Sequence, residues 1–454
     1  MAIETKTFGD VQTVTTASKS QYVPLTDAGG NVTKIGLENF RAALNMDDEQ
    51  LLNEWAFYID VNKASSLGST RVDTGGNMGM RQMWEDSVKS ILMNKDGYYC
   101  ELNPNDGRYT AEGDSLLNED GTLVTAFAHC DMMGVIPVTY GKVQTVTVGS
   151  TSFERLWLSL VPLPGGFVIP QQVVGKFKAS INGGALRSIP GVVTADTNTV
   201  YQFWQKAQVR SKNHGLSNGD FRDYLLWHMM SKYGYRDSQN TKGSDGTLVW
   251  GVGLDGTEST TASDKLSAQR YIKTGITLSL GDADGNVATT DASGDTVHCV
   301  NVGKFADPWG QKWEMQGGLA SVGTDMYFWR SNFVPSSSPT ADTFANIPHV
   351  KLTRKAAEAN PSGMNIITDK DGQGAYMIPK TDISGISYGD HYWYNAGGQL
   401  WLFGGASNFG SYCGLATADS NCGWSFSDAT CSARLAFYGK LTKVSSQKLS
   451  ELTA

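Results

Sequence analysis

The chain has 454 residues, which corresponds to two to four folding units at roughly 150 residues each. Only 18% of the residues are charged, 51 are glycine, and aspartate outnumbers glutamate by 32 to 13. Because aspartate and glycine favour turns whereas glutamate favours helices, this composition excludes a helical bundle, and the net charge of −8 argues against general nucleic-acid binding.

Residues 1–45 are predicted to form an attachment segment. Two β-prone runs, 22–25 and 32–35, flank an Asp/Gly-rich turn and predict a hairpin, and a helical stretch follows at 38–44. Asn45 is the predicted N-cap of a further helix, whose apolar face carries Leu51, Leu52, Trp55 and Tyr58. A segment this small cannot hold a core alone, so we expect it to bind partner chains or a larger particle.

The body of the chain is predicted to contain many short strands and two helices. Alternating segments such as 143–148 indicate strands. Apolar periodicity predicts helices at 200–207 and 220–233, and Gly234 stands where a C′ glycine would end the second helix. Residues 241–300 are rich in Gly, Ser, Thr and Asp and are predicted to be surface loops or an inserted hairpin.

The sequence contains no catalytic motif and no metal framework that we can identify. The cysteines show no CxxC spacing, so free thiols in a reduced compartment are expected for Cys100, Cys130, Cys299, Cys413, Cys422 and Cys431. Acidic turns at 282–285 and 369–372 could bind calcium, but they lack the trailing Glu of an EF-hand loop and are predicted to be ordinary hairpin turns. We therefore expect a non-enzymatic protein without cofactor or metal, calcium being the one ion left open.

Residues 400–439 combine two buried-strand patterns with a glycine-rich span between them. The apolar runs 400–403 and 433–437 predict strands, with Trp401 and Phe403 in the core. The span between the runs mixes Tyr and Phe, which give rigid contact area, with Ser and Asn, which give adaptable hydrogen bonding. This mixture is typical of recognition loops and predicts a binding surface.

The span has a regular frame: GG-x4-G-x3-GL over 404–415, a Ser-x-Ser alternation at 425–427, and Ala-Arg-Leu at 433–435. This frame resembles the variable region of proteins diversified by diversity-generating retroelements, such as the phage major-tropism-determinant-like proteins. Those proteins display variable residues on a C-type-lectin fold. Upstream, Asp-Pro-Trp-Gly at 307–310, followed by Trp313 and Glu314, resembles the signature of the sulfatase-modifying-factor branch of that fold, as does the segment 235–239.

The resemblance implies an α+β, β-rich chain with a C-type-lectin-like, sulfatase-modifying-factor-like domain over 120–440, which carries the insertion at about 241–300. Residues 46–119 would connect it to the N-terminal segment, and 441–454 would form a tail. The N-terminal run VPLTDAGGNVTKIGLENF resembles attachment segments of fibre proteins from phages of gut bacteria. The sulfatase-modifying enzymes bind copper with a cysteine pair, and no cysteine here stands in that context, so binding is expected rather than oxidation.

Carried over position by position, the resemblance implies a set of ligand-facing residues and a structural frame. The implied ligand-facing residues are Ser407, Asn408, Phe409, Ser411, Tyr412, Cys413, Ala416, Ala418, Asp419, Phe426, Asp428 and Thr430. The implied frame residues are Gly404, Gly405, Gly410, Gly414, Trp309, Trp313, Glu314 and Arg434. Flanking glycines favour exposure of Phe409 and Tyr412, and on a strand Phe426, Asp428 and Thr430 would share one face.

The implied function is that of a receptor-binding or adhesion protein in a phage tail or head fibre, which binds a bacterial surface protein or glycan. Other virion proteins would hold its N-terminal segment, and a homotrimer would multiply weak single sites. No secretory signal and no run of about 18 apolar residues is visible, so the virion, assembled in the host cytoplasm, is the expected location, with the bacterial cytoplasm or cell surface as alternatives. The alternative functions are a structural capsid or tail decoration protein and an oxidase related to the sulfatase-modifying enzymes.

Overall fold

The protein is described by a computed structural model. The described residues are 22–26, 32–36, 47–238, 272–290, 294, 296–353, 363–368, 375–380, 386–388, 390–406, 409 and 412–453. Strands dominate over helices, which confirms the predicted α+β, β-rich class. Among the described residues, no helix combines the length and apolar character needed to cross a bilayer.

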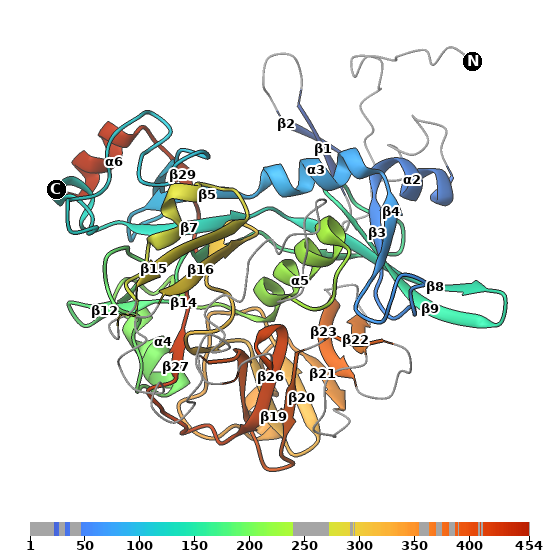
Figure 1. Ribbon diagram of the computed structural model, residues 1–454. Helices are drawn as coiled ribbons and strands as arrows, with labels where there is room; N and C mark the ends of the chain where they lie inside the picture. The colour runs from blue at the N-terminus through green and yellow to red at the C-terminus, as the bar shows by residue number, and fades with distance from the viewer. Residues whose placement is uncertain are drawn as a thin grey trace.

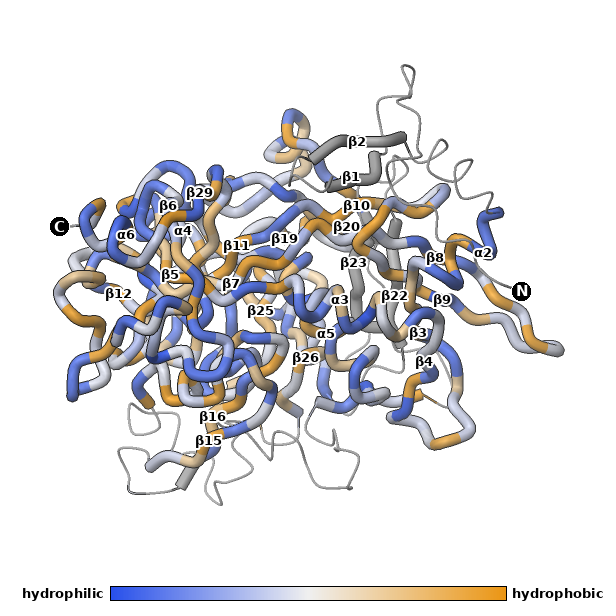
Figure 2. The backbone as a smooth tube through the Cα atoms, turned by 90° about the horizontal axis from the view of Figure 1, so that it is seen from above, coloured by the Kyte–Doolittle hydropathy of each residue, from blue (hydrophilic) through white to orange (hydrophobic). Residues whose placement is uncertain are grey.

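A seven-stranded sheet forms one half of the body. Its strands, in spatial order, are β14 (His214–Leu216), β28 (Leu435–Phe437), β11 (Gln172–Gly175), β7 (Asp131–Ile136), β5 (Lys89–Met93), β6 (Tyr98–Glu101) and β29 (Thr442–Lys443). All residues of β7 and β11 are buried, because both faces of the sheet centre are covered, and the chain through them is largely hydrophobic (Figure 2).

A five-stranded sheet carries the C-terminal span. Its order is β24 (Tyr392–Tyr394), β26 (Gly414–Cys422), β25 (Leu400–Gly404), β18 (Trp313–Met315) and β27 (Cys431–Ala433). The strand predicted at 400–403 is confirmed, and Trp401 and Phe403 are buried. The strand predicted at 433–437 is divided at Arg434, so that β27 lies in this sheet whereas β28 lies in the seven-stranded sheet.

A second five-stranded sheet is formed by β10 (Phe167–Ile169), β8 (Thr139–Val148), β9 (Thr151–Ser159), β3 (Phe57–Asp60) and β4 (Asp73–Gly76). The hairpin of β8 and β9, part of which the alternation at 143–148 predicts, extends away from the body (Figure 1). Three smaller sheets have two antiparallel strands each: β1 (Tyr22–Thr26) with β2 (Val32–Gly36), β12 (Ser180–Asn182) with β13 (Ala185–Arg187), and β22 (Gly363–Thr368) with β23 (Ala375–Lys380). Two others have three antiparallel strands each. One is β15 (Gly285–Thr290), β16 (Thr296–Val302) and β17 (Phe305–Ala306), and the other is β19 (Leu319–Val322), β20 (Asp325–Phe328) and β21 (Val350–Thr353).

Helix α5 (Gly219–Tyr233) lies at the centre of the molecule, between the seven-stranded sheet and the C-terminal strands (Figure 1). It is buried on all sides from Gly219 to Ser231, and it packs within a core that includes Trp84 and Phe305. It ends at Gly234, which has a φ of 69°, as the sequence predicts. The other helical elements are α2 (Asp48–Trp55), α3 (Met78–Ser87), α4 (Val200–Gln208), α6 (Ser446–Thr453) and the 3-10 turns η2 (Thr125–Phe127), η4 (Ile276–Leu280) and η5 (Ala341–Phe344).

Several local predictions need correction. The N-cap of α2 is Asp47 rather than Asn45, because Asp47 forms a capping box with Gln50. Tyr58 lies on β3 and not on the helix face, since α2 ends at Trp55. The hairpin predicted at 22–35 is confirmed by the pairing of β1 with β2, whereas the stretch 38–44 lies outside the described residues.

The insertion predicted at 241–300 is only partly a surface feature. Residues 239–271 lie outside the part of the chain that the structure describes. The predicted hairpin is present as β15 and β16, but Val300 and Val302 on β16 are fully buried in the core around α5. Val300 stands at the end of the Gly- and Asp-rich stretch and Val302 just beyond it, so their burial depends on packing against the rest of the core.

Candidate functional site

The topology of the C-terminal sheet brings several of the predicted residues to one end. Strand β25 runs toward this end and β26 starts from it, so Gly405 and Cys413, which follow and precede these strands, lie there beside each other. Strand β18 is antiparallel to β25, and β27 is parallel to β18, so Trp313 and Thr430 lie at the same end, where the Trp313 N–H donates to the Thr430 carbonyl at 2.7 Å. His391 precedes β24 there and donates its N–H to the Tyr412 carbonyl.

Two glycines of the predicted frame make the tight turn at this end. Gly404 and Gly405 have φ values of 85° and 79°, which L-residues with side chains rarely adopt. Gly404 accepts a hydrogen bond from the N–H of Gly310 at 3.0 Å, so the two glycine-containing motifs of the sequence are in direct contact. A Cβ on Gly405 would lie 2.3 Å from the sulfur of Cys413, which leaves room for glycine alone.

A buried ion pair joins the other frame residues. The Nε of Arg434 donates to Glu314 at 3.0 Å, and the other Glu314 oxygen accepts from the hydroxyl of Ser217. The remaining guanidinium N–H groups donate to the backbone carbonyls of Gly175, Lys176 and Ala306. Both oxygens of Glu314 and all three guanidinium nitrogens of Arg434 therefore have hydrogen-bond partners, which a fully buried charge pair requires. The frame residues Trp309 and Trp313 are buried as well, and Gly410 lies outside the described residues.

A bulge interrupts the pairing of β26 with β25 within the predicted set. Phe403 pairs with Ala418 but the next residue, Gly404, pairs with Gly414, so residues 415–417 are looped out of the ladder. The bulge is held by Asp390, which accepts from the Ala416 N–H at 2.8 Å. Burial, reinforced by the charge of Asp237, raises the pKa of Asp390 well above its usual range. The Asp390 carboxyl is therefore packed beneath the bulge as part of its structure.

Three of the predicted ligand-facing residues point into the core. Cys413, Ala416 and Ala418 are fully buried, and Cys413 donates its S–H to the carbonyl of Ala406. The prediction that these three contact a ligand is wrong. Every residue from Cys413 to Ala418 is buried, because both faces of this part of the sheet are covered, and a position-by-position transfer along the sequence cannot show that.

The segment 425–430 is also different from its prediction. It forms turns rather than a strand, so Phe426, Asp428 and Thr430 do not share a strand face. Asp428 instead accepts hydrogen bonds from the N–H and the hydroxyl of Thr430 at 2.8 and 2.7 Å. The half-buried Phe426 packs against the core. Asp419, on β26, accepts from the N–H of Asn421 at 2.6 Å.

The two predicted aromatic residues do come together, and they do so with residues that the candidate set omitted. Phe409 is half-buried, and its ring meets Trp313 and Trp393 edge-on, both at 5.2 Å between centroids. Tyr412 is 46% exposed and lies 4.7 Å from the ring of His391. His391 and Trp393 contact each other at 4.2 Å. We call His391, Trp393, Phe409 and Tyr412 the aromatic face.

The aromatic face is an exposed tyrosine on a firmly packed base. Its contacts run from the buried Trp313 outward to Tyr412, and each aromatic pair of this kind contributes about 0.5–1.5 kcal/mol beyond area burial. A rigid aromatic surface loses little conformational entropy when it binds. The aromatic density from 391 onward is the signal that could have identified His391 and Trp393. Ser407, Asn408 and Ser411, also predicted to face the ligand, lie outside the described residues.

The acidic turn at 282–285 has a structural role. One oxygen of Asp284 accepts from His228 at 2.7 Å and from Lys232 and Tyr233 at 2.8 Å, and the other accepts from the N–H of Gly303. Burial by itself would raise the pKa of Asp284, but the positive partners outweigh burial and hold it below its usual range. The oxygens of Asp284 are thus already engaged by donors. The turn at 369–372 lies outside the described residues. Among the described residues, no cluster of three or more His, Cys, Asp or Glu side chains could hold a metal ion.

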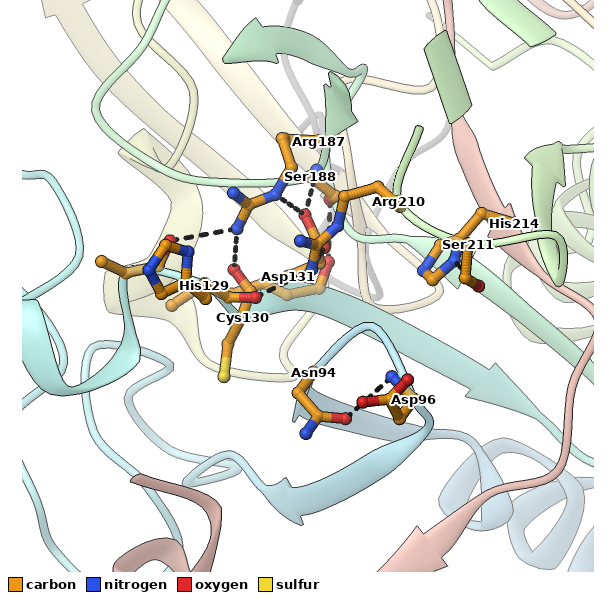
Figure 3. Close-up of polar contacts among 12 residues, drawn as sticks. Asn94, Asp96, His129, Cys130, Asp131, Arg187, Ser188, Arg210, Ser211 and His214 are labelled. Carbon is orange, nitrogen blue, oxygen red and sulfur yellow. Dashed lines mark hydrogen bonds and ion pairs between the residues drawn. The ribbon is translucent and has the colours of Figure 1, made fainter. Parts of the chain in front are cut away.

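A second polar cluster surrounds Asp131 at the start of β7 (Figure 3). Its carboxylate accepts from Arg187 at 2.8 Å, from Arg210 at 2.7 Å and from the N–H of Ser188 at 2.9 Å. Burial favours a raised pKa for Asp131, yet the two guanidinium charges together keep the pKa lowered. The neighbouring Cys130 is buried, which raises its pKa to about 12 and keeps it protonated. The cluster therefore ties β7 to β13 and to the end of α4.

None of the six cysteines forms a disulfide, as the spacing predicts. Cys413 directly precedes β26, beside Gly405, and Cys422 ends it opposite Leu400, so about five strand residues, roughly 16 Å, separate the two cysteines. Two thiolates that share one metal ion lie within roughly 5 Å of each other. These two cysteines therefore cannot together bind a copper ion.

No protein-family model matches this chain, and no curated protein matches its sequence.

Proposed function

We propose that the protein is a non-enzymatic receptor-binding protein of a phage virion, a tail or head fibre component that carries a C-type-lectin-like domain. The observation that carries the proposal is the aromatic face, where the exposed Tyr412 stands on Phe409, Trp393 and His391 at the end of a sheet. Phe409 and Tyr412 belong to the span that the resemblance marks as variable, whereas His391 and Trp393 lie outside it. A rigid base beside changeable residues suits the recognition of different surface ligands.

The proposed ligand is a protein or glycan of the bacterial surface. Aromatic side chains that combine an apolar ring with a polar group contribute strongly to both kinds of interface. The N-terminal segment 1–45 would attach the chain to other virion proteins, and a homotrimer would present three aromatic faces together. Diversification by a retroelement would act on the codons of 407–430, and a neighbouring reverse-transcriptase gene with a near-copy of these codons would support it.

The proposal predicts that Tyr412 dominates adsorption. The full-length chain, labelled with a fluorophore, is incubated with a panel of gut bacterial strains, and bound fluorescence is measured by flow cytometry. We expect binding to at least one strain, and we expect Tyr412→Ala to reduce the affinity by about tenfold or more, which is typical for an aromatic residue that dominates an interface. Tyr109→Ala is the matched control, because Tyr109 is a comparably exposed tyrosine, at 39%, outside the C-terminal sheet.

Equal binding by the Tyr412→Ala and Tyr109→Ala variants would remove the aromatic face from the proposal. Absence of binding to every strain, by a chain that nevertheless assembles into virions, would instead favour a structural decoration protein.

A further inference from the structure

The distal half of the β8–β9 hairpin is a two-stranded ribbon that projects from the body (Figure 1). Strand β10 covers the outer edge of β8 at 139–141, and β3 covers the outer edge of β9 at 155–158. Beyond these contacts, within the described part of the chain, the two strands pair only with each other as far as the turn at Gly149 and Ser150. A two-stranded ribbon is only marginally stable in water, so this half of the hairpin would gain from a third strand.

The outer edge of β8 is open beyond β10. The two-residue turn closes on the pair of Val148 and Thr151, and in an antiparallel ribbon such hydrogen-bonded pairs alternate with residues whose N–H and C=O groups point away from the partner strand. The outward residues of this part of β8 are therefore Val143, Thr145 and Thr147. No backbone group of the described residues bonds to these three, and Thr145 and Thr147 are exposed.

This open edge lacks the usual protection against pairing with another chain. Proteins commonly protect an exposed edge with charged residues, proline or a bulge. Residues 143–153 contain no charged residue and no proline, and the register from Tyr140 to Val148 is continuous. Val148, near the tip, is 61% exposed. An unprotected, β-branched edge of this kind indicates that another strand covers it in the assembled protein.

The sequence contains a second copy of this strand's residues. Residues 11–15 read Val-Gln-Thr-Val-Thr and are identical to residues 143–147 of β8. They precede the described part of the chain, whose first strand begins at Tyr22. Identical short segments with high β propensity, low charge and no proline pair in register with one another. In either direction this register sets Thr13, the middle residue of the run, beside Thr145, and Thr–Thr pairs are favourable cross-strand pairs.

We propose that residues 11–16 of a neighbouring copy of the chain add as a strand to the outer edge of β8. The hairpin extends away from its own body, so its edge is accessible to another copy (Figure 1). The contact joins two different surfaces, and such a heterologous contact closes into a ring when the rotation between copies permits. Two hairpin edges that paired with each other would form an isologous contact, which stops at a dimer. The exchange therefore suits the homotrimer of the proposed function, on which it rests, and it assigns the contact that holds the copies together.

Cysteine cross-linking of the full-length chain tests this contact. The variant Thr13→Cys/Thr145→Cys is oxidised by air with a copper–phenanthroline catalyst and separated on a denaturing gel without reductant. Directly opposed strand residues have Cα atoms about 5 Å apart, which is within the range of a disulfide. We expect bands of two and three chains that return to one chain on reduction. Co-expression of the two single variants should give a two-chain band alone, because each chain then carries one of the two new cysteines.

The matched control is Thr13→Cys/Ser152→Cys. Ser152 is exposed on the same hairpin, opposite Thr147, but it lies on β9, one strand further from the proposed contact and so about 10 Å away. A disulfide does not bridge Cα atoms more than about 7 Å apart, so this variant should give no cross-linked band. Each single variant, expressed alone, measures the background from the native cysteines.

A second measurement does not depend on cysteines. Thr13→Pro removes a backbone N–H that the added strand would donate to β8. We expect light scattering to show that the trimer of this variant dissociates at a concentration at least about tenfold higher than that of the wild type. Ser18→Pro, which lies outside the repeated run, is the control and should leave the trimer unchanged.

Absence of interchain bands in the Thr13→Cys/Thr145→Cys variant, cross-links confined to single chains, or a trimer that Thr13→Pro leaves unchanged would overturn the proposed exchange. Adsorption to cells is measured separately, through Tyr412. Adsorption without interchain cross-links would contradict the exchange alone, whereas interchain cross-links in a chain that binds no strain would contradict receptor binding alone.

Discussion

At the scale of single residues, burial decides the chemistry of the ionisable side chains. His214 lies fully buried on β14, with its Nδ1 2.8 Å from the hydroxyl of Ser211 and its ring 5.0 Å from that of Phe437 (Figure 3 shows the pair with Ser211). Its Nε2 has no hydrogen-bond partner. Burial, the largest cause, lowers the pKa of His214 to about 4 from the usual 6.5. The folded protein therefore holds this imidazole neutral over a range in which the unfolded chain protonates it.

His214 makes stability depend on pH. The contribution of the buried neutral imidazole to the free energy of unfolding is fully present above about pH 6.5, and it is lost as the pH falls through about 4. Between these two pH values only the unfolded chain binds the proton. The difference between the two pKa values corresponds to about 3 kcal/mol in the free energy of unfolding. Urea unfolding at a series of pH values should show that the stability difference between the wild type and His214→Gln shrinks by this order between pH 6.5 and 4. The exposed His129→Gln serves as the control, and a pH-independent difference for His214→Gln would contradict the assignment.

At the scale of elements, the crossing from β27 to β28 joins two sheets through Arg434. Its guanidinium reaches Glu314 on β18 and the carbonyls of Gly175 and Lys176 at the end of β11, so one side chain holds strands of both sheets. Its carbonyl also accepts from the N–H of Ser217, next to the start of α5. The Ala-Arg-Leu motif thus marks the point where the C-terminal sheet is fixed to the rest of the body.

Removing this guanidinium should therefore destabilise the whole chain. Arg434→Leu leaves Glu314 buried without its charge partner, which should lower the free energy of unfolding by about 3–5 kcal/mol. The loss is measured as a lower midpoint of urea unfolding. Lys443→Leu is the control. It removes the ion pair between Lys443, whose side chain is 59% exposed, and Glu101, and it should change the free energy of unfolding by at most about 1 kcal/mol. The double variant Arg434→Leu/Glu314→Leu should regain part of the loss, since no charge is then left unpaired. A loss no larger than that of the exposed pair would show that Arg434 does not join the sheets.

At the scale of the whole molecule, the sheets are built around α5 and leave the aromatic face at one end of the C-terminal sheet. A single small face of this kind gives weak binding. Because linked copies raise the effective concentration of each site, an adhesion protein gains much from being an oligomer.

We therefore expect the full-length chain to form a trimer. Light scattering after size-exclusion chromatography should give three times the mass of one chain. A mass equal to that of one chain across the micromolar range would contradict the trimer.

Part of this architecture could be predicted from the sequence because it depends on local patterns. The helix at 200–207 and the strand at 400–403 are specified by periodicity, and the left-handed Gly234 by the end of the apolar pattern of α5. Cys299, Val300, Asn301 and Val302 of β16 are all buried although they follow a stretch rich in Gly, Ser, Thr and Asp, so their burial depends on tertiary packing.

What the sequence by itself determined about this protein is the set of short-range features: a strand-rich chain, the glycine turn at 404–405 and the presence of Phe409 and Tyr412 beside it. Only the tertiary structure decided which of the neighbouring residues face outward. Every residue from Gly414 to Ala418 is buried, and the parallel pairing of β24 with β26 brings Trp393 beside Phe409. The physical reason is that a side chain's exposure depends on contacts with segments far away in the chain, which no local pattern encodes.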